Sequence, residues 1–558
     1  MFLEIRQQLQ LLLEEALKKA FPKQTSLPLL ELDVPTDKAH GEFSCNIALK
    51  SAKLFKKSPL ELAQELAAIF EAHVKTSPFQ NKIAKIEVKK PGFINFFLTD
   101  RALSEVIEEI FKQGKDYGQL SLGKGKKIQI EFVSANPTGP LSVAHARQAA
   151  VGDALANILK ALGFDAQKEF YVNDEGNQIN ILGGSIRLRA IEILGEKIEF
   201  PEDHYQGEYI KDMASVFMEQ NKIKTLEQIK GTDLKKWSEF GAVYLLDIIK
   251  KELEDFGVRF DHWAYQSKIA TPKNIETLLD YLGEKGFLYE KDGALWFKST
   301  DFGDDKDRVV EKSDGAYTYL TPDMVYHKNK FERGFDRLIN LWGPDHHGYI
   351  PRIKAFVEAF GKDREALNVL IVQLATIYRE GKPVSMSTRR GQYISLREVM
   401  EEVGVDAARF FFLMRHINMH LEFDLDLAKK QSPENPVYYI QYAHARVHSM
   451  NKKALEAAIT CKRAEFNLLK EREELDLLKM LGNFPEILKF CYEQLDPYPL
   501  VSYLQELANT FHKFYDYHRV IEPQNTALSS ERLALVNASG IVLANGLRLL
   551  GVSTPESM

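Results

Sequence analysis

Residues 128–163 read IQIEFVSANPTGPLSVAHARQAAVGDALANILKALG, and this stretch decides the fold of the middle of the chain. Its first six residues favour a buried strand, and a turn rich in Asn, Pro, Thr and Gly follows. Apolar residues then recur at helical spacing from Val151 to Leu162, and Gly163 ends the helix. A strand, a turn and a helix in this order predict one unit of a parallel sheet.

The same alternation continues on both sides of this unit. Further strands are expected at 168–172, 337–342 and 369–374, with helical segments between them. This pattern predicts a mostly parallel, Rossmann-type sheet, and such sheets bind ligands at the carboxyl ends of their strands.

The two ends of the chain differ from this middle part. Helical periodicity predicts helices at 1–20 and from Ser58 to Ala72, and 85–98 has a strand–turn–strand pattern. From about Ala428 strand signals fade and amphipathic helices dominate, the clearest at 468–481, with Gly482 as its expected end. We therefore expect a multidomain α/β protein. Its expected parts are an N-terminal α+β domain at 1–118, a Rossmann domain with insertions at 119–427, and an α-helical bundle at 428–558.

Composition limits the class of protein. The chain has 558 residues, 45% of them hydrophobic and 27% charged, which supplies several packed cores. A net charge of -6 argues against a DNA-binding protein with a wholly basic surface, but it permits local basic patches. We see neither an apolar run long enough for a transmembrane helix nor the basic start of a signal peptide, so we expect a cytoplasmic location.

The cysteines do not form a metal or disulfide pattern. Cys45, Cys461 and Cys491 lie far apart in the sequence and fit a reducing compartment. We therefore expect no protein-bound zinc.

The turn after the first strand of this middle part has the features of an anion site. Gly139 and the prolines on either side restrict the backbone path, and the following helix presents free N–H groups at its N-terminus. His145 near that end can donate to a phosphoryl oxygen. The alternative is a buried loop with a satisfied histidine, but the strand–turn–helix context favours the anion site.

The run SANPTGPLSVAHARQAAVGDALA, residues 134–156, resembles the HIGH region of bacterial arginyl-tRNA synthetases, written in that family as ANPTGPLHVGH. Ser142 stands where that family has its first histidine, and Ala144 stands at its glycine. The resemblance implies a class I catalytic domain that activates L-arginine with ATP and transfers it to the 3′ end of tRNA(Arg), with Mg²⁺ accompanying ATP.

The resemblance also implies site residues. Ser142 and His145 are expected to act in catalysis. The expected ATP-binding residues are Ala135, Pro137, Thr138, Gly139, Pro140, Leu141, Val143 and Ala144, joined by Gly343 and Asp345 from the run LWGPDHHG at 341–348.

The expected arginine pocket rests on carboxylates, because a guanidinium group pairs well with planar carboxylate oxygens. The resemblance continues through 291–297, 313–315 and YTYLTPD at 317–323. It implies that Asp323 contacts the guanidinium, that Tyr319 lines the pocket, and that Glu131 and Asn136 hold the side chain and α-amino group. His346 is a further candidate for the α-amino group or ribose. The alternative is structural, because a carboxylate at a strand end, taken alone, is more often a cap or an ion-pair partner.

A glycine-bounded run, GKPVSMSTRRG at 381–391, resembles the KMSTR variant of the family's KMSKS loop. Three cations and three hydroxyls suit triphosphate binding, and the alternative is a solvated basic turn. We expect Ser385 and Met386 to contact ATP, and Ser387 and Arg389 to act in catalysis. Ser385 replaces the usual lysine, so Arg389, Lys382 or the lysines at 124, 126 and 127 would supply the missing charge.

Two segments are expected to bind tRNA. NPVYYIQYAHAR at 435–446 resembles the start of the family's anticodon-binding domain, and it places Tyr438, Tyr442 and Arg446 on one helix face, with Asn435 before them. A tyrosine-rich core stripe is the alternative. Residues 39–48 resemble the family's N-terminal domain, with Phe43 and Asn46 as candidates, and a buried Phe43 is the alternative there.

Two other functions are weighed against this one. A catalytically impaired tRNA-binding paralogue is supported only by Ser142 and Ser385. A nucleotide-binding oxidoreductase is disfavoured because no G-x-G-x-x-G follows the first strand of the middle domain. We expect a monomer whose partners are tRNA(Arg), arginine and ATP, with neither DNA nor membrane binding.

Overall fold

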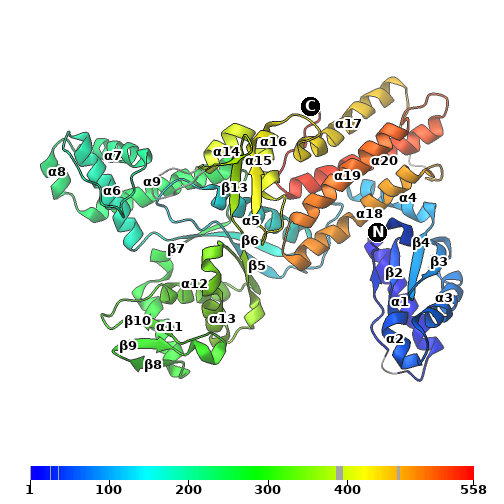
Figure 1. Ribbon diagram of the computed structural model, residues 1–558, viewed down its shortest axis with the longest axis horizontal. Helices are drawn as coiled ribbons and strands as arrows, with labels where there is room; N and C mark the ends of the chain where they lie inside the picture. The colour runs from blue at the N-terminus through cyan, green and yellow to red at the C-terminus, as the bar shows by residue number, and fades with distance from the viewer. Residues whose placement is uncertain (1, 25–26, 36, 385–393, 462–465) are drawn as a thin grey trace.

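The computed structural model describes residues 2–24, 27–35, 37–384, 394–461 and 466–558. Figure 1 shows an elongated molecule. The N-terminal region and the C-terminal helices lie at one end, the parallel sheet lies near the middle, and helices α6–α8 lie at the opposite end.

The N-terminal region is a helix–sheet unit. Its antiparallel sheet has the strand order β1-β2-β4-β3, and the expected hairpin is confirmed, with Val88 opposite Ile94. The expected helix that begins near Ser58 is also confirmed, and Ser58 caps it by accepting from the backbone N–H of Glu61. The elements are α1 (Phe2–Ala20), β1 (Leu32–Asp33), β2 (Phe43–Cys45), α2 (Ile47–Phe55), α3 (Pro59–Lys75), β3 (Ile83–Lys89), β4 (Phe93–Leu98) and α4 (Asp100–Gln113).

The central sheet confirms the expected Rossmann-type topology. Its five strands are all parallel, in the order β12-β11-β5-β6-β7. They are β5 (Lys127–Glu131), β6 (Asp165–Val172), β7 (His262–Tyr265), β11 (Arg337–Trp342) and β12 (Leu367–Ile371), and α5 (Val143–Ala161) follows β5.

The first strand of this sheet is shorter than expected. It ends at Glu131, and the backbone then takes positive φ angles at Val133 (67°) and Ser134 (38°). A positive φ is incompatible with an extended strand and turns the chain sharply. The turn therefore places the backbone after Glu131 along the carboxyl edge of the sheet.

Two insertions complete the middle of the chain. The first has its own core around Trp237 and consists of α6 (Asn177–Ile193), α7 (Glu208–Gln220), α8 (Leu226–Gly231) and α9 (Leu234–Asp255). The second surrounds a three-stranded antiparallel sheet, β10-β9-β8. It consists of α10 (Gln266–Ile269), α11 (Pro272–Glu284), β8 (Leu288–Lys291), β9 (Ala294–Phe297) and β10 (Arg308–Glu311), and it packs on α12 (Leu320–Glu332) and α13 (Ile350–Ala359).

The C-terminal part is a helical bundle, as expected. A small sheet of β13 (Ala375–Arg379), β14 (Lys382–Pro383) and β15 (Leu421–Asp424) precedes it, with α14 (Leu396–Val403), α15 (Val405–Phe412) and α16 (Leu425–Lys429). The bundle helices are α17 (Pro436–Glu456), α18 (Arg472–Gln494), α19 (Tyr498–Tyr517) and α20 (Thr526–Leu549).

The expected helix end at Gly482 is wrong. Helix α18 continues through this glycine to Gln494. A Cβ at position 482 would lie 2.3 Å from the ring of Phe2, so the glycine allows α1 to approach α18 closely. The N-terminal region is thus packed directly on the bundle, and α4 also contacts α18 and α20.

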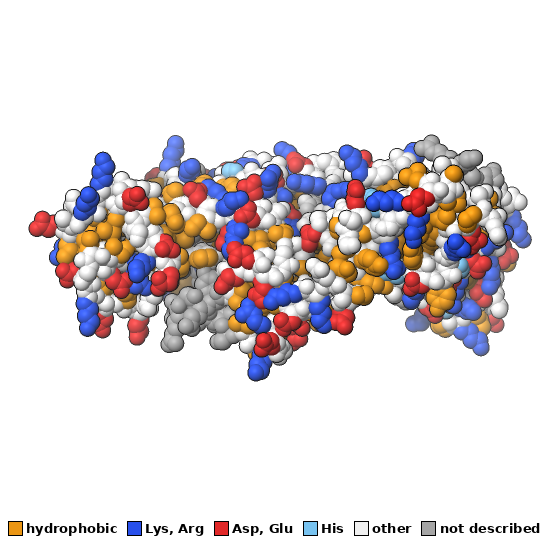
Figure 2. Space-filling view, turned by 90° about the horizontal axis from the view of Figure 1, so that it is seen from above, with side chains coloured by type: hydrophobic (Ala, Val, Ile, Leu, Met, Phe, Trp, Pro, Cys, Tyr) orange, Lys and Arg blue, Asp and Glu red, His pale blue; other side chains and the backbone are white. Residues whose placement is uncertain are grey.

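The surface carries both signs of charge. Figure 2 shows Lys and Arg side chains intermingled with Asp and Glu over the face it presents. Among the described helices, none has the length and apolarity needed to cross a bilayer.

Candidate active site

Two adjoining hollows lie at the carboxyl edge of the central sheet. The sheet-edge hollow, of about 340 Å³, is bounded by the ends of β5 and β11 and the start of α5. The side hollow, of about 680 Å³, extends towards β10 and α13. Both are lined by Ser134, Asn136, Tyr171, Asp323, His346 and Tyr349. These side chains therefore form a wall between two chambers of one site.

Asp323 is a half-buried carboxylate on this common wall. Its Oδ2 accepts a hydrogen bond of 2.7 Å from the Tyr349 hydroxyl, and within the described residues it has no ion-pair partner. Burial raises the pKa of Asp323 to about 7, and the negative charge of Glu131 adds to the rise. A cation bound beside this carboxylate would relieve both effects, so the wall suits a positively charged ligand.

Glu131 differs from Asp323 because it is already neutralised. Lys330 Nζ lies 2.6 Å from Glu131 Oε2, and the Ser134 hydroxyl donates to Oε1 over 2.9 Å. Lys330 is fully buried and also donates to Asn340 Oδ1 over 3.0 Å. Of the two expected carboxylates, only Asp323 is therefore open to a guanidinium group.

Lys330 is a site residue that we did not expect from the sequence. It follows Asp323 by seven positions, and His327 lies four positions after Asp323, so all three occupy one face of α12. His327 Nδ1 lies 2.8 Å from the Asp323 carbonyl, and Asn340 Nδ2 lies 3.0 Å from His327 Nε2. The helical spacing of these polar residues was the signal that could have revealed them.

His145 lies in the first turn of α5 and lines the sheet-edge hollow. Burial lowers the pKa of His145 to about 4, so the ring is neutral near pH 7. The backbone N–H of Ser142 donates to His145 Nδ1 over 3.2 Å, which leaves the ring proton on Nε2. His145 is thus an uncharged donor, and Ser142 orients it.

The start of α5 is anchored by Arg147. This buried guanidinium donates to the backbone carbonyls of Gln373 (2.7 Å), Met419 (2.9 Å) and His416 (3.0 Å). The segment after β12 is thereby held beside the hollow, where Leu374 forms part of its lining.

The expected ATP-binding turn is only partly exposed to the hollow. Ala135, Ala144, Gly343 and Asp345 line it. Pro137, Leu141 and Val143 are buried and line neither chamber, so their expected contact with ATP stays a prediction. Thr138, Gly139 and Pro140 are half-buried and line neither chamber.

The expected KMSKS-like residues Ser385, Met386, Ser387 and Arg389 lie outside the described residues. The chain that follows lies against the turn between β5 and α5, where the backbone N–H of Leu396 donates to the Leu141 carbonyl over 2.8 Å. Lys382 lies in β14 and is exposed.

Two further substrate candidates lie on the walls of the hollows. Asn136 Nδ2 donates to Gln178 Oε1 over 2.7 Å. His346 lines both chambers and lies 3.4 Å from Asp345. Tyr319 lines only the side hollow and is 78% exposed, so it forms part of the rim.

The bundle places three expected tRNA-contacting residues together. The rings of Tyr438 and Tyr442 are stacked with centroids 6.3 Å apart. Arg446 lies 4.6 Å from the centroid of Tyr442 and 4.5 Å from that of Tyr515. The expectation that they share one face of α17 is confirmed, and such a face suits stacking with bases.

Two other expected tRNA contacts are corrected. Phe43 is 2% exposed in the core of the N-terminal region. Asn435 is buried as the N-cap of α17, and its amide donates to the carbonyls of Ala428 and Lys430. Neither side chain is accessible to a nucleic acid. Asn46, beside α2, is half-buried, and its Oδ1 lacks a partner among the described residues.

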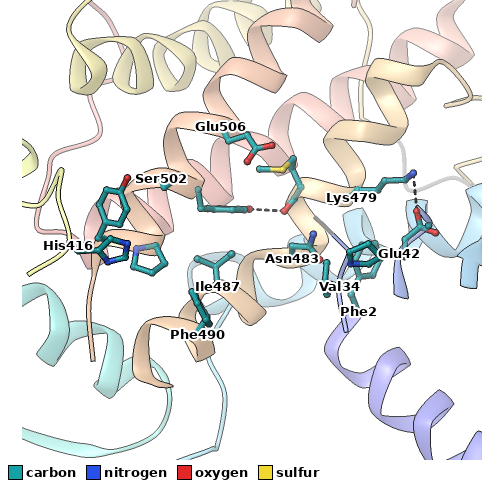
Figure 3. A pocket seen from close by; sticks show the side chains of 16 residues that line it. Phe2, Val34, Glu42, His416, Lys479, Asn483, Ile487, Phe490, Ser502 and Glu506 are labelled. Atoms are coloured by element: carbon teal, nitrogen blue, oxygen red, sulfur yellow. Dashed lines mark hydrogen bonds and ion pairs between the residues drawn. The ribbon is translucent and has the colours of Figure 1, made fainter. Parts of the chain in front are cut away.

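A third hollow lies where the N-terminal region meets the bundle (Figure 3). It has a volume of about 400 Å³ and shares no lining residue with the two chambers at the sheet edge. Phe2 and Val34 line one side of it and Ile487 and Phe490 another, and Glu42 pairs with Lys479 over 2.9 Å. It belongs to the junction between these regions.

Comparison with known proteins covers most of the chain. Family models match as "Arginyl tRNA synthetase N terminal domain" over residues 7–98, "tRNA synthetases class I (R), catalytic domain" over 106–420, and "DALR anticodon binding domain" over 440–558.

Individual relatives agree with these domain matches. The chain is 45% identical to arginine–tRNA ligase 1 of Halalkalibacterium halodurans over 557 residues, covering 100% of this chain and 99% of that one. It is 43% identical to arginine–tRNA ligase of Bacillus subtilis, covering 100% of both chains.

Solved structures show the same fold. A putative arginyl-tRNA synthetase from Campylobacter jejuni superposes with a TM-score of 0.75 at 35% identity, covering 83% of this chain and 100% of that chain. The Thermus thermophilus arginyl-tRNA synthetase superposes with a TM-score of 0.74 at 21% identity, covering 99% and 100%. With these matches along almost its whole length, the chain belongs to the arginyl-tRNA synthetases, class I ligases that use ATP to join arginine to tRNA.

Proposed function

We propose that Asp323 binds the guanidinium group of arginine and that the phosphates of ATP lie beside His145 at the start of α5. The single observation that carries this proposal is the half-buried Asp323 carboxylate, which has no cation partner within the described residues. Bidentate pairing with a guanidinium would restore its charge balance. Asn136, on the same wall, and Glu131, in the sheet-edge hollow, would then orient the α-amino end of the substrate.

The neutral His145 ring suits phosphate chemistry. In adenylate formation, the arginine carboxylate attacks the α-phosphate and pyrophosphate leaves. A donor at Nε2 can hydrogen-bond a phosphoryl oxygen in the transition state, and it does so without a change of protonation state. The free N–H groups of the first turn of α5 add to this stabilisation.

Mg²⁺ is proposed to accompany ATP, where it would neutralise charge on the phosphates. Asp345 is an exposed carboxylate on the lining of the sheet-edge hollow and suits a ligand of this ion. The KMSKS-like residues Ser385, Met386, Ser387 and Arg389 are proposed to act on the same phosphates.

The other parts of the chain are proposed to bind tRNA. The face formed by Tyr438, Tyr442 and Arg446 would contact the anticodon arm, and Asn46 would contact tRNA from the N-terminal region. We propose the division at 1–118, 119–427 and 428–558, a monomer that does not bind DNA, and a cytoplasmic location, where tRNA is charged for translation.

A variant of Asp323 tests the proposal. Asp323→Asn keeps the size of the side chain but removes its charge, so kcat/KM for arginine should fall by about 100-fold or more in tRNA-supported pyrophosphate exchange. Asp280→Asn, on the exposed side of α11, is the matched control and should behave like the unchanged protein. If both variants had the same kcat/KM for arginine, Asp323 would not be the residue that binds the guanidinium group.

The same assay addresses the catalytically impaired paralogue. Glu131, Asn136, His145 and Asp323 line one hollow, which favours an active enzyme. Folded protein that failed to exchange pyrophosphate with tRNA present, but still bound tRNA, would favour the paralogue.

A further inference from the structure

Arg352 is a cation of the side hollow that the function described above does not use. It lies in the first turn of α13 and lines this hollow together with Tyr349 and Asp323. Within the described residues its guanidinium group forms no hydrogen bond or ion pair, and its Nε is buried without a partner. A buried donor in this state is costly unless a ligand satisfies it.

The guanidinium group of Arg352 lies over the aromatic ring of Tyr349. Its guanidinium carbon lies 5.4 Å from the centroid of Tyr349. The hydroxyl of the same tyrosine donates to Asp323. Arg352, Tyr349 and Asp323 therefore form a continuous series of contacts from the side hollow to the proposed guanidinium site.

The other arginine in this hollow is different. Arg308 pairs with Asp304 through two hydrogen bonds of 2.8 and 2.9 Å. Its charge is therefore already balanced. Of these two arginines, Arg352 has the free fork of donors that suits an anionic ligand.

We infer that Arg352 binds a backbone phosphate at the 3′ end of tRNA, and that the side hollow receives the terminal nucleotides. The inference rests on the proposed placement of arginine at Asp323.

The chemistry of the reaction favours a tRNA phosphate over the other anions. ATP is placed in the sheet-edge hollow beside His145, and the arginine carboxylate becomes part of the adenylate there. The remaining anions are the phosphates of the tRNA. The two hollows share Asn136 and Asp323, so a nucleotide in the side hollow brings its ribose hydroxyl next to the arginyl group. The hollow has a volume of about 680 Å³, and the exposed ring of Tyr319 on its rim offers a face for a base.

The test compares Arg352→Gln with Lys354→Gln in the full-length enzyme. Both variants remove one positive charge from α13, but Lys354 pairs with Glu365 and does not line the hollow. Loss of a charge-assisted hydrogen bond should lower kcat/KM for tRNA by roughly 10–100-fold in Arg352→Gln. KM for arginine and ATP should stay within about twofold, and Arg352→Lys should recover part of the loss because it keeps the charge.

Salt dependence provides a readout that a merely structural role would not change. One lost phosphate contact should lower the slope of log affinity against log salt by about 0.7. Arg352→Gln should show this change with intact tRNA but not with tRNA that lacks its three terminal nucleotides. Lys354→Gln should show it with neither.

Several outcomes would overturn the inference. Equal weakening of intact and shortened tRNA would place the contact elsewhere on the tRNA. Weaker use of arginine, without weaker inhibition by its decarboxylated analogue agmatine, would assign Arg352 to the substrate carboxylate. If Asp323→Asn leaves KM for arginine unchanged, the proposed binding of arginine at Asp323 is wrong. The comparison of intact with shortened tRNA then still decides whether Arg352 contacts the 3′ end.

Discussion

Lys330 Nζ lies 2.6 Å from Oε2 of Glu131, and this buried ion pair determines which carboxylate of the site is open to substrate. Lys330 has no exposed side-chain surface, and Glu131 has 8%. Because the pair is internally neutral, the unpaired charge on the common wall belongs to Asp323.

The first prediction concerns this pair. Lys330→Met would leave Glu131 as a buried carboxylate without its cation, which should lower the free energy of unfolding by roughly 3–5 kcal/mol. The double variant Lys330→Met/Glu131→Gln removes both charges and should recover much of that loss. Urea unfolding would measure both values. A double variant no more stable than the single one would show that the ion pair is not the cause.

The second prediction concerns the pH dependence of arginine use. Because the pKa of Asp323 is about 7 without substrate, the carboxylate is protonated in much of the protein below that pH. We expect kcat/KM for arginine to rise about tenfold per pH unit below pH 7 and to level off above it. Other charges that act on Asp323 come from Glu131 and Lys330, and Arg352 lies against Tyr349, which donates to Asp323. A profile that is flat from pH 5.5 to 8 would contradict the raised pKa.

The third prediction concerns stability without substrate. The pKa of Asp323 in the folded protein lies above the unfolded value near 3.9. The protonated Asp323 side chain therefore contributes to the free energy of unfolding at acidic pH, and this contribution is lost as pH rises towards 7. Asp323→Asn has no such charge to bury and should exceed the unchanged protein in stability by roughly 1–2 kcal/mol at pH 8. The difference should shrink near pH 4. Thermal unfolding at the two pH values, without arginine, measures it.

The fourth prediction concerns His145. Because the neutral His145 ring acts as a hydrogen-bond donor, an amide side chain should preserve more activity than a methyl group. His145→Ala should lower kcat of adenylate formation by about 100-fold, while His145→Gln should retain part of the activity. Ser142→Ala should have a small effect, because the backbone N–H of residue 142 still orients the ring. A large loss in Ser142→Ala would mean that the hydroxyl itself contacts substrate.

The fifth prediction separates a core residue from a surface one. Phe43→Ala removes a buried ring and should lower the free energy of unfolding by roughly 3–5 kcal/mol. Tyr442→Ala, on the face of α17, should weaken tRNA binding by about 5–100-fold with a smaller loss of stability. Unfolding curves and tRNA titrations on both variants check this contrast, and a stable Phe43→Ala protein with weak tRNA binding would reverse the assignment.

The sequence alone determined the parallel sheet, the strand–turn–helix unit at 128–163 and the helical end of the chain, because hydrophobic periodicity and turn residues are local signals. It also indicated Asp323 and His145, through motifs that are continuous in the chain. Only the tertiary structure decided that Glu131 is neutralised by Lys330, which lies 199 positions away. It also decided that Phe43 and Asn435 face the core, and that Gly482 admits Phe2 instead of ending a helix. These outcomes depend on which distant side chains meet. Helical spacing can place Lys330 on the same face of α12 as Asp323, but it does not identify Glu131 as its partner.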